Sequence, residues 1–336
     1  MAKWTRRPRE SRCSCNEYFD SAISQHKKDL LVSNFKSVKA ALIGVALALG
    51  GASCVYAQQA VEESNPAAQP KTAEEIAKEL ANPAGSPASI GINLQYTTYD
   101  GDLPGAGDQD TLWFVFQPVL PFPVGNNGRN IIVRPAVPVI FDQPVFNAAT
   151  GTWDSADINL ADIGFDAVYS GTTMQGKGRG YLSGVGLAGT LPTATDDDVG
   201  GDQWRFGPEV FGGLVRPWGV VGALASHPWD AGGSNKAKFS TTSIQYFYAY
   251  SIGNGMQIAS SPLITYDWQA DSDNAWTVPL GVGLSKTKII GTTPWKFQGQ
   301  IQYYAKQPDL FGPEWLFKFT VTPVIMCANH IAVIPA

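Results

Sequence analysis

The feature that most constrains the fold is an alternation of apolar and polar side chains with a period of two, which begins at Ile90 and continues along most of the chain. The segment 295–306 shows it most clearly, because Gln298, Gln300 and Gln302 alternate there with Phe, Gly, Ile and Tyr residues. Successive side chains of a strand point to opposite faces of its sheet, so each such segment has one apolar and one polar face. The pattern predicts an all-β protein.

Two architectures can accommodate strands of this kind. In a soluble sandwich the apolar faces pack together in a dry core, whereas in a transmembrane barrel they face lipid and the polar faces line the lumen. A dry core excludes unpartnered amides and ammonium groups such as those of Gln300 and Lys318. An inverted sandwich would expose rows of Phe, Ile and Tyr to water. The alternation therefore favours the barrel.

Twelve segments of the chain carry this strand pattern, an even number, as expected of a bacterial single-chain barrel. They are 90–97, 111–119, 130–141, 160–170, 181–191, 203–214, 220–229, 239–251, 256–268, 275–285, 295–306 and 313–324. The predicted fold class is a transmembrane antiparallel β-barrel of about 12 strands, preceded by a short N-terminal periplasmic helix.

The connections between these segments differ in charge. Those after the odd-numbered strands hold fifteen aspartates, opposed only by Lys236 and Lys238. Those after the even-numbered strands are mostly shorter and carry only Lys and Arg among charged residues, including Arg129 and Arg216. Long loops of outer-membrane barrels lie outside the cell and short turns face the periplasm. The acidic connections are therefore predicted to be extracellular, with tryptophans near the strand ends at the lipid boundary.

The first 57 residues contain a predicted export signal. Basic residues at 36 and 39 precede an apolar run at 40–51, and a cleavage site follows Ala57. The run is shorter than the roughly 20 apolar residues of a membrane-spanning helix. A lipoprotein signal ending at Cys54 is disfavoured, because Gly51 stands where an aliphatic residue is expected. We interpret the polar residues 1–34 as an upstream extension, with translation starting at a non-AUG codon near residues 30–32.

Four parts of the chain are expected. Residues 1–57 form the extension and signal peptide, 58–88 a periplasmic lead-in, 89–325 the barrel and 326–336 a C-terminal tail. A capping box of Thr72 and Glu75 begins the short helix of the lead-in, and Pro83 ends it. A small plug inside the lumen is the alternative for this helix. The lead-in is favoured because no long loop tethers the helix inside the barrel.

Composition and motifs argue against several other classes of protein. Residues 58–336 carry 15 Lys and Arg against 25 Asp and Glu, so we expect no binding to nucleic acid, which requires a basic surface. The chain has three histidines and no nucleophile-elbow, zinc-protease or phosphate-binding motif. We therefore expect no catalytic residue and no cofactor, and interpret His227 as structural.

The acidic connection at 192–202 contains a weak candidate calcium site, because clustered carboxylates are hard oxygen ligands. Its residues are Asp196, Asp197, Asp198 and Asp202. The favoured alternative is a solvated acidic loop, bridged by divalent cations to the phosphates of lipopolysaccharide.

One long motif and several short ones are shared with a known family. They are LPTATDDD at 191–198, Gly200-Gly201, Trp204, Gly207-Pro208, Tyr266-Asp267-Trp268 and Gly312-Pro313-Glu314. With these motifs, spread over residues 72–324, the sequence resembles proteobacterial proteins often mislabelled neuromedin U, which are similar to the MetA-pathway phenol-degradation family. The resemblance implies an outer-membrane barrel that passes small organic molecules, including aromatic ones. It carries over no catalytic residue.

The first hypothesis for function is therefore a passive channel in the bacterial outer membrane. Candidate lumen residues are Asn93, Gln95, Arg134, Gln298, Gln300, Gln302 and Lys318, which would select solutes by size and hydrogen bonding. Expected partners are small solutes, outer-membrane lipid and lipopolysaccharide, and the barrel-assembly machinery. The alternatives are a closed structural barrel with acidic surface loops and, third, a barrel enzyme acting on lipids.

Overall fold

The structure is a computed structural model that describes residues 71–125, 127–234 and 237–325, all within one compact unit, Leu49–Ala336. The predicted signal peptide and the predicted tail at 326–336 lie outside the described residues. Among the residues that are described, no helix has the length and apolar character needed to cross a membrane.

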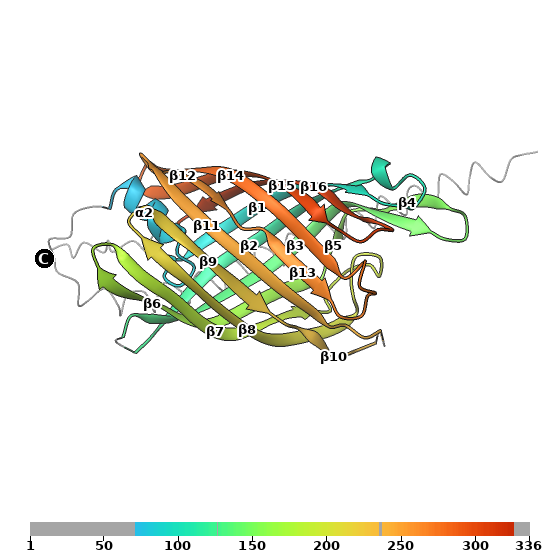
Figure 1. The fold of residues 1–336 in the computed structure, drawn as a ribbon, viewed down its shortest axis with the longest axis horizontal. Helices are drawn as coiled ribbons and strands as arrows, with labels where there is room; N and C mark the ends of the chain where they lie inside the picture. The colour runs from blue at the N-terminus through green and yellow to red at the C-terminus, as the bar shows by residue number, and fades with distance from the viewer. Residues whose placement is uncertain (1–70, 126, 235–236, 326–336) are drawn as a thin grey trace, which may run out of the picture. The chain divides into compact units, whose positions relative to one another are not determined.

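The barrel wall has twelve antiparallel strand positions, which we call staves; ten are single strands and two consist of two consecutive strands. Their closure into a barrel (Figure 1) confirms the predicted fold class. The staves are β1 (Ser89–Asp100), β2 (Asp110–Val124), β3 (Arg129–Asn147), β6 (Ile163–Gly176), β7 (Arg179–Leu191), β8 (Gln203–Arg216), β9 (Gly219–Ser226) with β10 (Trp229–Gly233), β11 (Thr241–Gly253), β12 (Met256–Ser260) with β13 (Leu263–Asp267), β14 (Trp276–Ile290), β15 (Thr293–Lys306) and β16 (Gly312–Pro323). The barrel closes because β1 pairs with both β2 and β16.

Two staves are interrupted at a proline. Pro228 separates β9 from β10, and Pro262 separates β12 from β13. Proline has no N–H to donate to a neighbouring strand, so the hydrogen-bond ladder breaks at these points. Directly before β6 in the barrel sheet, β5 (Asn159–Leu160) pairs with β3 at Val139 and Ile140. Beyond the barrel wall, β4 (Thr152–Ala156) pairs with the extended end of β3, and the short 3-10 helix η1 (Ala106–Asp108) follows β1.

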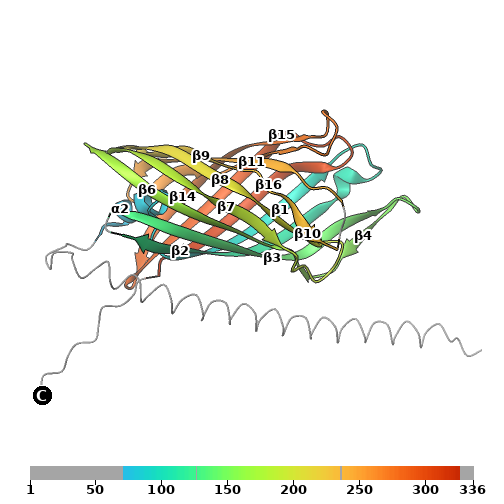
Figure 2. The same ribbon diagram turned by 90° about the horizontal axis from the view of Figure 1, so that it is seen from below.

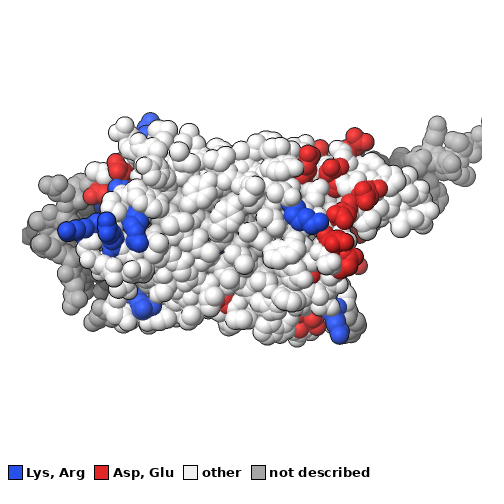
Figure 3. Space-filling model, in the orientation of Figure 1, with Lys and Arg blue, Asp and Glu red and all other residues white. Residues whose placement is uncertain are grey.

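The strand faces are arranged as the alternation predicted. On β14, Leu280 and Val282 are 58% and 52% exposed on the outside of the barrel, whereas the inward-facing Gln300 and Gln302 of β15 are 8% and 4% exposed. On the face drawn in Figure 3, a largely uncharged band separates an end rich in Lys and Arg from an end rich in Asp and Glu. An apolar outer band between charged rims is the surface of a barrel that sits in a bilayer.

Short turns gather at one end of the barrel, together with the helix α2 (Ala73–Leu80) (Figures 1 and 2). We name this end the α2 mouth and the opposite end the loop mouth. The connections after β2, β6, β8, β11 and β14 are turns of two to four residues. At the loop mouth lie the longer connections and the β4 extension. The separation of short basic turns from long acidic loops is thus as expected from the sequence.

Tryptophans lie near the strand ends, with one exception to the expected girdle. Trp204, Trp229 and Trp268 are exposed on the outer surface. Trp113, however, is directly opposite Gln95 in the β1–β2 register and therefore lies on the inward face of its strand.

The segment after α2, residues 81–86, enters the barrel, and we name it the plug segment. Ala84 is 1% exposed and packs in a cluster of inward-facing apolar side chains that includes Val168 and Phe211. The side chain of Asn82 donates a 2.9 Å hydrogen bond to Thr172 on β6, and Ser170 donates to the carbonyl of Ala84. The plug alternative therefore describes these residues better than the favoured lead-in outside the barrel. The physical reason is that the apolar cluster inside the lumen offers a dry surface that the small side chains of the segment cover.

Candidate functional site in the barrel lumen

A cavity of about 310 Å³ lies inside the barrel, beneath the plug segment. Pro83 and Ser86 of the plug segment form one side of it. Around it, the barrel wall contributes two chemically different surfaces. The polar surface comes mainly from β15 and β16, and the apolar surface comes mainly from β9, β11 and β12. The lumen is therefore not uniformly polar, in contrast to the expectation from strand alternation.

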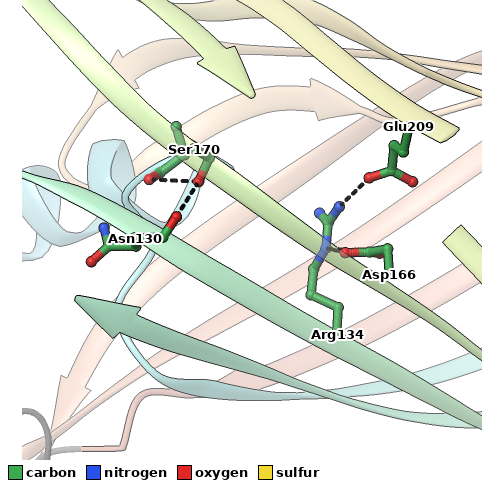
Figure 4. A network of polar contacts seen from close by, with 6 residues as sticks. Asn130, Arg134, Asp166, Ser170 and Glu209 are labelled. Carbon is green, nitrogen blue, oxygen red and sulfur yellow. Dashed lines mark hydrogen bonds and ion pairs between the residues drawn. The ribbon is translucent and has the colours of Figure 1, made fainter. Parts of the chain in front are cut away.

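A triad of charged residues lies beside this cavity, and two of them, Arg134 and Asp166, line it (Figure 4). The guanidinium Nε of Arg134 lies 2.8 Å and 3.0 Å from the two carboxylate oxygens of Asp166, and its Nη2 lies 3.8 Å from Oε1 of Glu209. The three side chains come from β3, β6 and β8 and are at most 19% exposed. Arg134 was a predicted lumen residue, whereas sequence reasoning missed its two partners. The signal that could have found them is an acidic residue midway along an amphipathic strand.

The strand register explains why these residues meet. Arg134 is directly opposite Asp166 on the neighbouring strand, but β7 lies between β6 and β8. At the level of the triad β7 contributes Gly186, which is opposite Glu209, and Ala188. Because these residues have almost no side chain, the arginine reaches across β7 to the second carboxylate.

Amide side chains on the opposite wall are mostly engaged within the barrel. Gln300 Oε1 accepts hydrogen bonds from the Ser260 hydroxyl at 3.0 Å and the Ser261 N–H at 3.2 Å. Gln298 donates to the Ala259 carbonyl at 3.2 Å, and the Asn93 carbonyl oxygen accepts from Thr320 at 2.8 Å. The bonds from Gln298 and Gln300 reach from β15 across β14 to the end of β12, and the Asn93–Thr320 bond joins the neighbouring strands β1 and β16. Part of the predicted pore lining therefore holds the barrel together.

The seven predicted lumen residues divide into two groups. Arg134, Gln298 and Lys318 border the cavity. The other four lie on inward-facing strand positions outside its lining, and they are Asn93, Gln95, Gln300 and Gln302.

Two lysines on the polar wall differ from the triad in having no partner. Lys296 on β15 and Lys318 on β16 both border the cavity. Among the described residues, neither ammonium group makes a hydrogen bond or an ion pair. Sequence reasoning predicted Lys318 and missed Lys296, although both are inward-facing residues of amphipathic strands.

His227 lies away from this cavity, at the junction of β9 and β10. Its Nδ1 is 2.8 Å from the Thr242 hydroxyl, and its Nε2 is 3.4 Å from the Ser240 hydroxyl. The ring lies beside Trp229 and Trp268, at centroid distances of 5.9 and 6.3 Å. The Trp268 indole also donates to the Thr242 hydroxyl at 2.9 Å. His227, Thr242 and Trp268 therefore form a hydrogen-bonded cluster that holds the β9–β10 junction in place.

The candidate calcium site is not supported. Within the described ranges, no group of three or more His, Cys, Asp or Glu side chains is placed to hold a metal ion. Asp162, which directly precedes β6, instead accepts hydrogen bonds from three backbone N–H groups of this loop, those of Thr193, Ala194 and Gly201. Backbone donors of the loop converge on the Asp162 carboxylate. Asp196, Asp197 and Asp202 line one pocket with Asp162 but form no metal-binding group within the described residues.

Comparison with solved structures bears on the fold. The chain is similar to the COG4313 outer membrane channel from Pseudomonas putida F1, with 14% identity, coverage of 78% of this chain and 100% of that one, and a TM-score of 0.53. The fold is that of an outer-membrane β-barrel. Outer membrane phospholipase A from Escherichia coli matches with a TM-score of 0.38 and 11% identity, over 77% of this chain and 100% of that one. A BenF-like porin from Pseudomonas fluorescens Pf-5 matches with a TM-score of 0.24 and 8% identity, over 71% of this chain and 98% of that one. No protein-family model matches the sequence, and neither does any curated protein.

Proposed function

We propose that this protein is an outer-membrane channel that passes small organic molecules by passive diffusion, with the plug segment closing the lumen in the conformation described. The observation that carries the proposal is the cavity inside the barrel, which has charged and amide side chains on one wall and is covered by a short N-terminal segment. A purely structural barrel would fill its lumen with large side chains from its own strands.

The attachment of the plug segment supports a movable closure. Two hydrogen bonds join the segment to β6 of the barrel wall, a 2.9 Å bond from Asn82 to Thr172 and a long 3.4 Å bond from Ser170 to the Ala84 carbonyl. Its apolar contacts come from small residues such as Ala81 and Ala84. Small side chains bury little area, so the free energy of displacing the segment is modest compared with unfolding the barrel.

The setting of the channel follows from the predictions made on the sequence. The export signal in residues 1–57 and the apolar outer band support a place in the outer membrane, with the α2 mouth facing the periplasm and the acidic loops outside. Lipopolysaccharide at the loop mouth and the barrel-assembly machinery are proposed partners. The motif resemblance to the family mislabelled neuromedin U supports organic, including aromatic, solutes.

The test is solute flux through the purified protein. Liposomes that contain the full chain would be compared with liposomes that contain a variant lacking residues 71–86, using uptake of small neutral aromatic alcohols and planar-bilayer conductance. We expect low flux for the full chain and a several-fold increase for the deletion. The absence of flux and conductance in both would favour the closed structural barrel instead.

The enzyme alternative is tested at the junction cluster. Ser240 lies within reach of the His227 ring, which is the arrangement that a hydroxyl nucleophile requires. We propose a structural role, because the imidazole is held by Thr242 and lies beside the rings of Trp229 and Trp268. Release of fatty acid from phospholipid micelles by the full chain, and its loss in Ser240→Ala, would overturn this assignment.

A further inference from the structure

We propose that the lumen cavity binds small organic anions with an apolar body, the anionic group between Lys296 and Lys318 and the body against the apolar wall. This inference rests on the proposed function, because it names the class of solute that the same channel accepts.

The first step is the charge balance of the cavity. Asp166, the acid that lines it, already receives the Arg134 guanidinium on both carboxylate oxygens, and Glu209 pairs with the same arginine from β8. Lys296 and Lys318 border the cavity from the other side, without a carboxylate partner among the described residues. The charges of Arg134, Asp166, Lys296 and Lys318 in the lining sum to +2, and to +1 when the neighbouring Glu209 is counted, so the excess is positive and lies on β15 and β16.

The second step is the geometry of the two lysines. In the β15–β16 register Lys296 is opposite Thr322, and Lys318 is opposite Gln300, four positions further along the barrel. At roughly 3.3 Å per residue their backbones are about 13 Å apart along the strands. Gln298 lies between these levels, borders the same cavity, and carries an amide that can contact an anion. Flexible lysine side chains can close on a group at this position from both ends.

The third step is the cost of leaving ammonium groups in a confined space. A charge removed from bulk water is stabilised only by a counter-charge or by good hydrogen bonds. A bound carboxylate supplies both, since it accepts charge-assisted hydrogen bonds from lysine. Asp166, the triad carboxylate that lines the cavity, offers no equivalent site for a cation, because Arg134 already donates to both of its oxygens.

The fourth step is the opposite wall, which selects the rest of the ligand. Leu224, Phe247 and Ala249 line the cavity there, and Leu80 and Pro83 cover it from the α2 side. A cavity of about 310 Å³ is at the small end of the usual range for small-molecule sites. The fit is therefore to a compact anion with one apolar group, such as an aromatic or short-chain carboxylate.

The test uses benzoate and its neutral isostere benzamide, which have almost the same shape. Binding to the full-length protein in detergent would be measured by calorimetry for the wild type, Lys296→Met, Lys318→Met and the double variant. Lys288→Met is the matched control, since Lys288 is an exposed lysine near the end of β14 and does not border the cavity. Heat-modifiable migration on gels would verify that every variant forms the barrel.

We expect benzoate to bind the wild type at least about ten-fold more tightly than benzamide, because one charge-assisted hydrogen bond contributes that much. Each single lysine variant should lose about ten-fold in benzoate affinity, with benzamide affinity unchanged, and the control should match the wild type. Equal affinity for the two probes, or undiminished benzoate affinity in the folded double variant, would overturn the inference. Equilibrium binding is independent of flux, so benzoate binding without flux or conductance in both the full chain and the variant lacking residues 71–86 would refute the channel and leave the anion site standing.

Discussion

Removing the arginine of the lumen triad should destabilise the barrel strongly. Arg134→Met leaves the carboxylates of Asp166 and Glu209, which are 16% and 3% exposed, without their counter-charge. Breaking a buried ion pair by removing one partner typically costs about 3–5 kcal/mol. The Asp166 contact is bifurcated, with the Arg134 Nε–H donating to both carboxylate oxygens at 2.8 and 3.0 Å, whereas the Glu209 contact is long at 3.8 Å. Most of the loss therefore comes from Asp166, and a total of about 3 kcal/mol, the low end of that range, is expected.

Denaturant unfolding of the protein refolded into phospholipid vesicles measures this loss. The matched control is the triple variant Arg134→Met, Asp166→Asn, Glu209→Gln, which removes all three charges and keeps the side-chain shapes. Replacing every member of a buried charge cluster by neutral groups is often close to neutral in stability, so the triple variant should recover most of the loss. If Arg134→Met unfolds at the wild-type denaturant concentration, or if the triple variant is no more stable than Arg134→Met, the triad does not stabilise the barrel through its charges.

Three further predictions follow from other parts of the fold. Gly186→Val should abolish folding, because a Cβ there overlaps the backbone of β6, whereas Gly299→Ala, where nothing lies within 4 Å, should fold normally; barrel formation on gels checks both. Ala84→Asp should expel the plug segment from its apolar cluster and raise planar-bilayer conductance several-fold, and unchanged conductance would contradict the role of that segment in closure. The hydrogen bonds from Thr72 lower the pKa of Glu75 below its ordinary value of 4.5. A lowered carboxyl pKa stabilises helix α2 above pH 4.5, and this stabilisation is lost as the pH falls through the lowered pKa. The hydrogen-exchange protection factors of residues 73–81 should therefore fall in acid, and Glu75→Gln, which removes the titrating carboxyl, should remove that pH dependence.

The positions of the staves could be predicted because strand alternation is local. The segment 295–306 presents its glutamines on one face whatever it pairs with, and β15 spans Thr293–Lys306. The end of β3 shows the limit of this reasoning. The predicted strand stops at residue 141, but β3 runs to Asn147 because β4 pairs with it beyond the barrel. That pairing is a contact between segments and leaves no period in the sequence.

The candidate site could be predicted only in part. An arginine on the polar face of a strand indicated that Arg134 faces the lumen, but its partners depend on β7 offering Gly186 between β6 and β8. The preference for a periplasmic lead-in likewise treated the helix as an isolated element. Its location near the lumen follows from the apolar side chains of β6, β8 and β11, which no pattern within residues 72–86 reveals.

The sequence by itself determined the strand count, the face that meets lipid and the separation of basic turns from acidic loops. These properties follow from side-chain periodicity and connection length, which act within one or two neighbouring strands. Only the tertiary structure decided which charges are paired, which lysines are left without a partner and what covers the cavity. Closing the barrel brings together the inner faces of strands that are far apart in the chain, so these contacts depend on stave order and register as a whole.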